Sequence, residues 1–109
     1  MKIEQEECNN FLLVKPHGTL DTVDLSSLKE YLDRLVESGK AFIIDLSNLN
    51  FVSSSGLRVL LQTANAMKES KRKFVTIVPQ EDMYEVFELS GFTRLFPVAN
   101  NLQDAIAKL

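Results

Sequence analysis

Three consecutive serines are the residues of this chain best placed to do chemistry. Ser53, Ser54 and Ser55 lie between a short apolar segment and a run with helical periodicity. At the start of a helix several backbone N–H groups lack partners, and the helix dipole favours negative charge. A hydroxyl there can cap the helix, and a phosphate there gains charge-assisted hydrogen bonds. The segment therefore predicts either a structural helix cap or a site of regulatory phosphorylation.

The other reactive side chains give little support for enzyme chemistry. The only histidine, His17, lies between Pro16 and Gly18, which predicts a turn, and the only cysteine, Cys8, is expected to pack as a small apolar residue. Nucleophilic catalysis needs a base beside the nucleophile, and a metal site needs several ligands. Ser-x-x-Lys patterns at 26–29 and 70–73 lack companion motifs. We therefore expect no enzyme, no metal and no cofactor.

Composition narrows the class of protein further. The chain has 109 residues, with 12 Lys and Arg against 15 Asp and Glu, so its net charge of −3 argues against direct nucleic-acid binding. No apolar run approaches the roughly 20 residues of a membrane span. A basic cluster at 68–73, formed by Lys68, Lys71, Arg72 and Lys73, is interpreted as a solvated turn. We expect one cytoplasmic domain over 1–109.

Hydrophobic periodicity predicts an alternation of strands and helices. Strands are expected at 11–14, 41–44 and 74–78, with a weaker edge strand at 3–8 and a short one at 95–96. Helices are expected at 24–38, with Asp24 as N-cap, from 53–55 to about 70, from 83 to Gly91, and at 101–109. Residues 45–50 are expected to form a polar loop. This order predicts a small α/β sandwich with a mixed, mostly parallel sheet of four or five strands and about four helices.

Three segments carry a resemblance to a known family. Residues 45–61 (DLSNLNFVSSSGLRVLL) resemble the signature of bacterial anti-sigma factor antagonists, members of the STAS domain superfamily. Residues 18–21 (GTLD) are similar to the Gly-x-Leu-Asp turn of that family before its first helix. Residues 89–92 (LSGF) are similar to its Ser-Gly-Leu/Phe turn after the third helix. The three segments occur in the family's order over residues 11–109.

The resemblance implies a phosphorylation-gated binding protein. Such proteins bind an anti-sigma factor that is also a serine kinase of the histidine-kinase-like ATPase fold, and binding releases a sigma factor for transcription. The kinase phosphorylates the serine before the signature glycine, here Ser55, with Ser54 as the fallback acceptor, and a serine phosphatase reverses the reaction. The partner-binding residues implied by the resemblance are Asp21, Thr22, Ser53, Ser54, Ser55, Gly56 and Arg58.

Two positions depart from the family pattern. The signature usually reads Asp-Ser-Ser-Gly, and here Ser53 replaces the Asp; Arg58 stands where a glycine often follows Gly-Leu. Both changes make the surface less acidic. Leu57 is expected to point into the core, and Gly56 to allow close approach of a partner backbone. The alternative is a STAS signalling or scaffold module, stressosome-like or small-ligand-binding, that phosphorylation does not regulate. A monomer is expected in either case.

Overall fold

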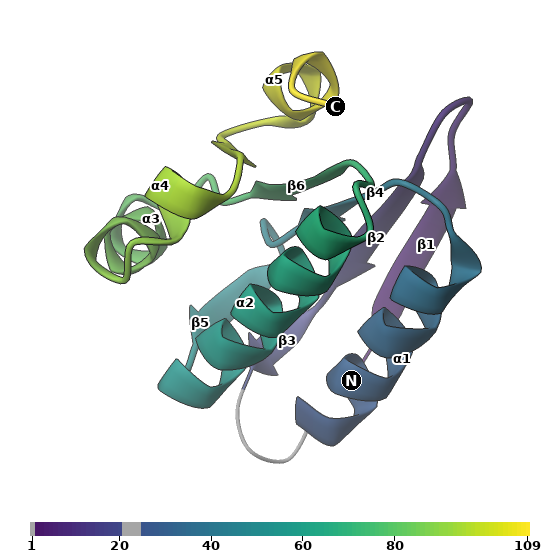
Figure 1. The fold of residues 1–109 in the computed structure, drawn as a ribbon. Coiled ribbons are helices and arrows are strands. Elements are labelled where there is room, and N and C mark those ends of the chain that lie inside the picture. Colours follow the sequence, from purple (N-terminus) through teal and green to yellow (C-terminus); the bar gives the residue numbers. More distant parts are fainter. Residues whose placement is uncertain (1, 21–24) are drawn as a thin grey trace.

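A five-stranded sheet forms the centre of the computed structural model, which describes residues 2–20 and 25–109 (Figure 1). The strand order is β1-β2-β4-β6-β7; β1 pairs antiparallel with β2, and the other pairs are parallel. A separate parallel ribbon joins β3 to β5. The elements are β1 (Ile3–Glu7), β2 (Leu12–Pro16), β3 (Gly18–Leu20), α1 (Leu25–Ser38), β4 (Phe42–Asp45), β5 (Leu49–Val52), α2 (Ser54–Glu69), β6 (Phe74–Ile77), α3 (Glu81–Leu89), α4 (Phe92–Leu95), β7 (Val98–Ala99) and α5 (Leu102–Ala107).

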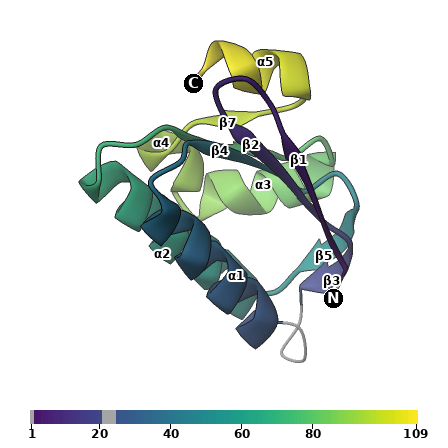
Figure 2. The same ribbon diagram turned by 90° about the vertical axis from the view of Figure 1, so that its right-hand side faces the viewer.

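The two faces of the sheet are covered unequally. Helices α1 and α2 lie side by side on one face, and α5 lies on the other (Figures 1 and 2). Successive strand residues point to opposite faces, so Phe42 and Ile44 of β4 enter the large core under α1 and α2, while Ile43 enters a smaller core under α5. Burial on both faces explains the continuous apolar run of this strand.

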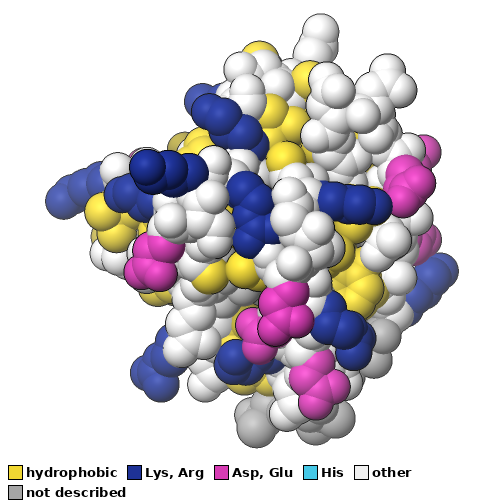
Figure 3. Space-filling view, turned by 45° about the vertical axis from the view of Figure 1, so that its right-hand side comes forward, with side chains coloured by type: hydrophobic (Ala, Val, Ile, Leu, Met, Phe, Trp, Pro, Cys, Tyr) yellow, Lys and Arg dark blue, Asp and Glu magenta, His cyan; other side chains and the backbone are white. Residues whose placement is uncertain are grey.

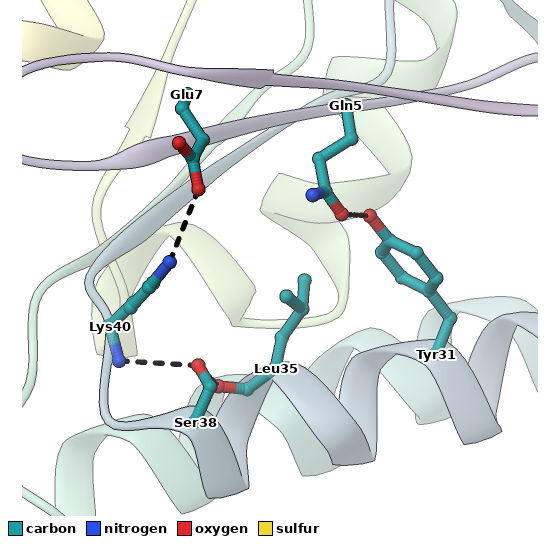
Figure 4. A network of polar contacts seen from close by, with 6 residues as sticks. All are labelled: Gln5, Glu7, Tyr31, Leu35, Ser38 and Lys40. Carbon is teal, nitrogen blue, oxygen red and sulfur yellow. Dashed lines mark hydrogen bonds and ion pairs between the residues drawn. The ribbon is translucent and has the colours of Figure 1, made fainter.

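Helix α1 and the turn that follows it are joined to the edge strand β1 by polar contacts (Figure 4). The Tyr31 hydroxyl donates to the side-chain oxygen of Gln5, and Lys40 Nζ lies 3.3 Å from Glu7 Oε1. Three of the five β1 side chains are glutamates. Charged side chains on an edge strand discourage pairing with another chain. The sheet therefore ends at β1 on this side.

The expected fold class is confirmed, and several boundaries differ. The expected strand at 95–96 is wrong: Leu95 ends α4, Phe96 is its C-cap, and the strand follows at Val98–Ala99. The expected loop at 45–50 is wrong at both ends, because β4 extends to Asp45 and β5 begins at Leu49. Of the turn expected at 18–21, residues 18–20 form strand β3, and Asp21 lies outside the described residues. These strands are short and are defined by distant pairing partners, so local composition does not reveal them.

Two further expectations concern the N-cap of α1 and the basic cluster at 68–73. The expected N-cap of α1, Asp24, lies outside the described residues. The basic cluster at 68–73 does form the end of α2 and the turn before β6. Within residues 2–20 and 25–109, no helix combines the length and apolar character that crossing a membrane requires.

Candidate functional site

The first turn of α2 is built by Ser53. This residue has extended backbone angles (φ −74°, ψ 168°), and its Oγ accepts a hydrogen bond of 3.0 Å from the Gly56 backbone N–H. The Ser53 carbonyl also accepts the Leu57 N–H at 2.9 Å. A side-chain oxygen that binds the third helical N–H is the usual N-cap arrangement. Of the two roles that the serine-rich segment predicted, the structural cap is therefore filled by Ser53.

The other two serines are left on the surface. Ser54 and Ser55 are the first and second residues of α2, and both are exposed. The first turn of α2 carries no acidic side chain. The unpaired N–H groups and the helix dipole make this end favourable for an anion. A phosphate on either hydroxyl would therefore occupy a favourable electrostatic position without displacing the cap.

The next two residues face inward. Leu57 is 9% exposed and belongs to the large core, which confirms its expected direction. Gly56 is also buried. The part of Gly56 in binding a partner stays a prediction.

Arg58 places a positive charge one helical turn from the exposed serines. It is exposed and lies at i+4 from Ser54 and i+3 from Ser55. Residues at these spacings are neighbours on a helix surface. In the unmodified chain a cation in the first turns of a helix opposes the dipole. A phosphate on Ser54 or Ser55 would give the guanidinium a partner.

An apolar groove adjoins Ser54 and was missed by the sequence analysis. It has a volume of about 390 Å³ and lies between β5, α2 and α3, and its lining residues are Phe51, Val52, Ser54, Leu57, Arg58, Leu61 and Val86. Phe51 is 56% exposed and Val86 45% exposed. The exposure of Phe51 depends on which side of β5 faces solvent, and the sequence of residues 51–52 does not indicate that side. Only the pairing of β5 with β3 shows it.

Two of the expected partner-binding residues are not placed. Asp21 and Thr22 lie outside the described residues. The β3–β5 ribbon ends with Leu20 opposite Val52, the residue before the Ser53 cap. The described strand that precedes Asp21 therefore ends beside the start of α2.

The remaining reactive residues lie away from this site. His17 follows β2, and its Nε2 is 3.2 Å from Glu4 Oε1. Cys8 is a free, half-buried thiol that packs against the smaller core, as expected. In the part of the chain that the structure describes, no cluster of three or more His, Cys, Asp and Glu side chains could hold a metal ion.

Comparison with known proteins gives one consistent result. The profile of the STAS domain matches residues 2–105. A Bordetella bronchiseptica protein named "Putative anti-sigma factor antagonist BtrV" is 32% identical over 108 residues, which cover 98% of this chain and 93% of that protein. The anti-sigma F factor antagonist of Paenibacillus polymyxa is 22% identical and is covered over 95% of its length, by 100% of this chain.

Solved structures show the same fold. An anti-sigma factor antagonist from Mycobacterium paratuberculosis superposes with a TM-score of 0.87 at 24% identity, covering 97% of this chain and 91% of that one. The phosphorylated form of Bacillus SpoIIAA superposes with a TM-score of 0.73 at 19% identity, covering 97% of both chains. At these identities the superpositions establish the architecture.

Proposed function

Because the chain belongs to the STAS domain family, among its anti-sigma factor antagonists, we propose that its unphosphorylated form binds an anti-sigma factor that is also a serine kinase. Binding releases a sigma factor for transcription. Phosphorylation of Ser55 ends binding, and a serine phosphatase restores it. The protein acts in the cytoplasm as a monomer and performs no catalysis itself.

The observation that carries this proposal is the difference between the environments of Ser53 and Ser55. Ser53 holds the first turn through its hydrogen bond to Gly56, while Ser55 is exposed one residue inside the helix. Serine and aspartate are comparable N-caps. Ser53 can therefore replace the aspartate of the usual signature without loss of the cap. Ser55 stays available for modification because the fold does not use its hydroxyl as the cap.

A phosphate on Ser55 would act on the partner and leave the domain folded. It adds about −1.5 to −2 charges at neutral pH. The helix dipole and Arg58 stabilise that charge in the free protein. Binding of the partner would strip water from this charge, and that desolvation costs several kcal/mol, which weakens binding by orders of magnitude. The switch is therefore electrostatic and steric, at a surface whose backbone does not rearrange.

The apolar groove beside Ser54 supports a protein as the ligand of this site. Phe51 and Val86 leave apolar surface exposed in the groove that Ser54 also lines. Exposed apolar side chains next to a few polar groups are typical of protein interfaces. In this proposal the groove receives apolar side chains of the anti-sigma factor, and the exposed serines lie at its margin.

Affinity capture from the source organism tests the proposal. Tagged wild type, Ser55→Asp and Gln103→Glu are used as bait, with bound proteins identified by mass spectrometry. Gln103 is the second residue of α5, as Ser55 is of α2, and is exposed at a distance from the site, so it controls for one added negative charge. Wild type and Gln103→Glu should recover a histidine-kinase-like ATPase, and Ser55→Asp should not.

The other outcomes also decide between roles. Equal recovery of the ATPase by all three baits would show that negative charge at Ser55 does not control binding. Recovery of no such ATPase by any bait would overturn the antagonist proposal in favour of a STAS scaffold module.

A further inference from the structure

A pocket with a cationic rim lies at the end of α2 opposite the exposed serines. We propose that it docks a segment of a second protein that carries carboxylates around an apolar side chain. The pocket has a volume of about 240 Å³ and opens between the end of α2, the start of β6 and the segment after α4. Its basic residues, called here the cationic rim, are Lys68, Arg72, Lys73 and Lys108. Because α2 separates it from Ser55, it is a second surface, independent of the proposed switch.

Positive charge is concentrated at this end of the molecule. Half of the chain's 12 Lys and Arg residues belong to α2's last turns, the turn that follows, α4 and the C-terminus: Lys68, Lys71, Arg72, Lys73, Arg94 and Lys108. No Asp or Glu lines the pocket. On the face drawn in Figure 3, several Lys and Arg side chains lie across the upper and middle part, with Asp and Glu at its right edge and further charges of both signs below. The segregation of charge therefore holds for the lining of the pocket, whereas Glu69, in the same stretch of the chain, is exposed outside it.

The charges of the rim are not neutralised by ion pairs within the described part of the chain. None of the ion pairs among the described residues includes a rim residue. Arg72 Nη1 is buried and has no hydrogen-bond acceptor in the described part of the chain. This nitrogen lies beside Gly39, which does not line the pocket, so the docking site is supported by the charge of the rim and not by this nitrogen. Lys68 Nζ lies 5.9 Å from the centre of the Phe96 ring, which orients the ammonium group over the pocket's apolar wall.

The backbone that carries the rim is held in a defined turn. Helix α2 ends with the Arg72 N–H donating to the Met67 carbonyl and the Lys71 N–H donating to the Lys68 carbonyl, each at 3.0 Å. This pair of bonds is the Schellman motif. Its left-handed position is occupied by Lys71 (φ 58°), where glycine is usual. The turn therefore presents Arg72 and Lys73 from an ordered backbone.

The walls of the pocket favour a protein segment over a nucleic acid. They are formed by apolar residues, of which Leu95 is 58% exposed. The two aromatic rings of the pocket, Phe74 and Phe96, are each only 6% exposed, so neither offers a face on which a base could stack. The net negative charge of the chain also opposes a long polyanion. A protein segment fits both the apolar walls and the cationic rim, because an apolar side chain can pack against Leu95 while carboxylates pair with the rim.

A titration of ¹⁵N-labelled protein tests the docking site. The probe is a synthetic 12-residue peptide in which Leu and Phe alternate with Glu, added at low salt. Amide shifts should saturate and be confined to 64–73, 94–97 and 108. A peptide of Glu and Ser alone should bind at least tenfold more weakly. Lys68→Glu/Lys73→Glu should weaken the Leu/Phe/Glu peptide at least tenfold. Lys29→Glu/Arg34→Glu, with the same charge change on exposed residues of α1, should not.

Several results would overturn the docking site. They are the absence of saturable shifts at millimolar peptide, shifts centred on residues 51–58, or equal binding of the Glu/Ser peptide. Tighter binding of a single-stranded oligonucleotide, or of vesicles containing an anionic phospholipid, would assign the rim to those ligands instead. None of these readouts depends on Ser55, so the antagonist proposal and the docking site can fail separately.

Discussion

Ser53 Oγ lies 3.0 Å from the backbone nitrogen of Gly56, and this hydrogen bond closes the first turn of α2. The contact distinguishes the environment of Ser53 from that of Ser55. Ser53 satisfies an N–H group that the helix leaves open, and Ser55 presents a hydroxyl to solvent. A charge can therefore be added at Ser55 without removal of the cap.

Ser53→Ala should destabilise the domain through loss of this cap. Replacement of a serine N-cap by alanine costs about 1 kcal/mol of the free energy of unfolding, which for a domain of this size lowers the melting temperature by about 4 °C. Ser53→Asp should restore the stability, because aspartate accepts the same N–H. Urea denaturation of the three proteins measures the effect, and an alanine variant as stable as wild type would show that Ser53 does not cap α2.

Lys71→Gly should stabilise the protein. Lys71 has a φ of 58°, and a left-handed conformation costs an L-residue about 1–2 kcal/mol, a cost that glycine avoids. Part of the gain is offset because glycine adds entropy to the unfolded chain, so the net gain is about 0.5–1 kcal/mol. Lys71→Ala, which removes the charge but keeps the Cβ, should show no such gain. If alanine stabilised as much as glycine, charge repulsion in the turn would be the cause.

Thr76→Val should be neutral or stabilising. Thr76 is fully buried in β6, and its hydroxyl has no hydrogen-bond partner among residues 2–20 and 25–109. Burying an unsatisfied hydroxyl costs about 1–3 kcal/mol, and valine has nearly the same shape. Thermal and urea unfolding give the difference. A clear loss of stability would mean that the hydroxyl makes a bond that the structure does not show.

Tyr31→Phe should reduce the alkaline sensitivity of the fold. Burial raises the pKa of Tyr31 above its ordinary value of 10.0, and the nearby Arg34 charge partly opposes this rise. A folded-state pKa that is raised favours the protonated form, so its contribution to stability is complete below pH 10 and is lost as the pH rises through the folded-state value. Wild type should therefore lose more stability than Tyr31→Phe above pH 10. Parallel losses in the two proteins would remove Tyr31 from the transition.

Long amphipathic elements could be predicted from the sequence, and short paired strands could not. The helix expected at 24–38 is described from Leu25 to Ser38, because its leucine spacing is a local property. Strand β5 forms through pairing with β3, about 30 residues earlier in the chain, and nothing within residues 49–52 specifies that partner. For the same reason, the sequence did not predict the exposure of Phe51 or the groove beside it.

In the candidate site, too, local features could be predicted from the sequence, and features that depend on tertiary structure could not. The serine-rich segment indicated a helix start, which the structure has at Ser54. The sequence did not indicate which serine is the cap, since that depends on the backbone angles of Ser53. The basic run at 68–73 was visible as a turn, but the approach of Lys108 and the burial of Arg72 Nη1 depend on tertiary packing.

The central claim is that charge at Ser55 blocks a partner while the domain stays folded. The most direct test is calorimetric titration of the purified ATPase recovered by affinity capture with unphosphorylated protein and with protein stoichiometrically phosphorylated on Ser55. Phosphorylation should weaken binding at least 100-fold, equivalent to about 2.7 kcal/mol, with the melting temperature of the free protein unchanged or raised. Equal affinities of the two forms, or a phosphorylated form that melts well below the unmodified one, would contradict the claim.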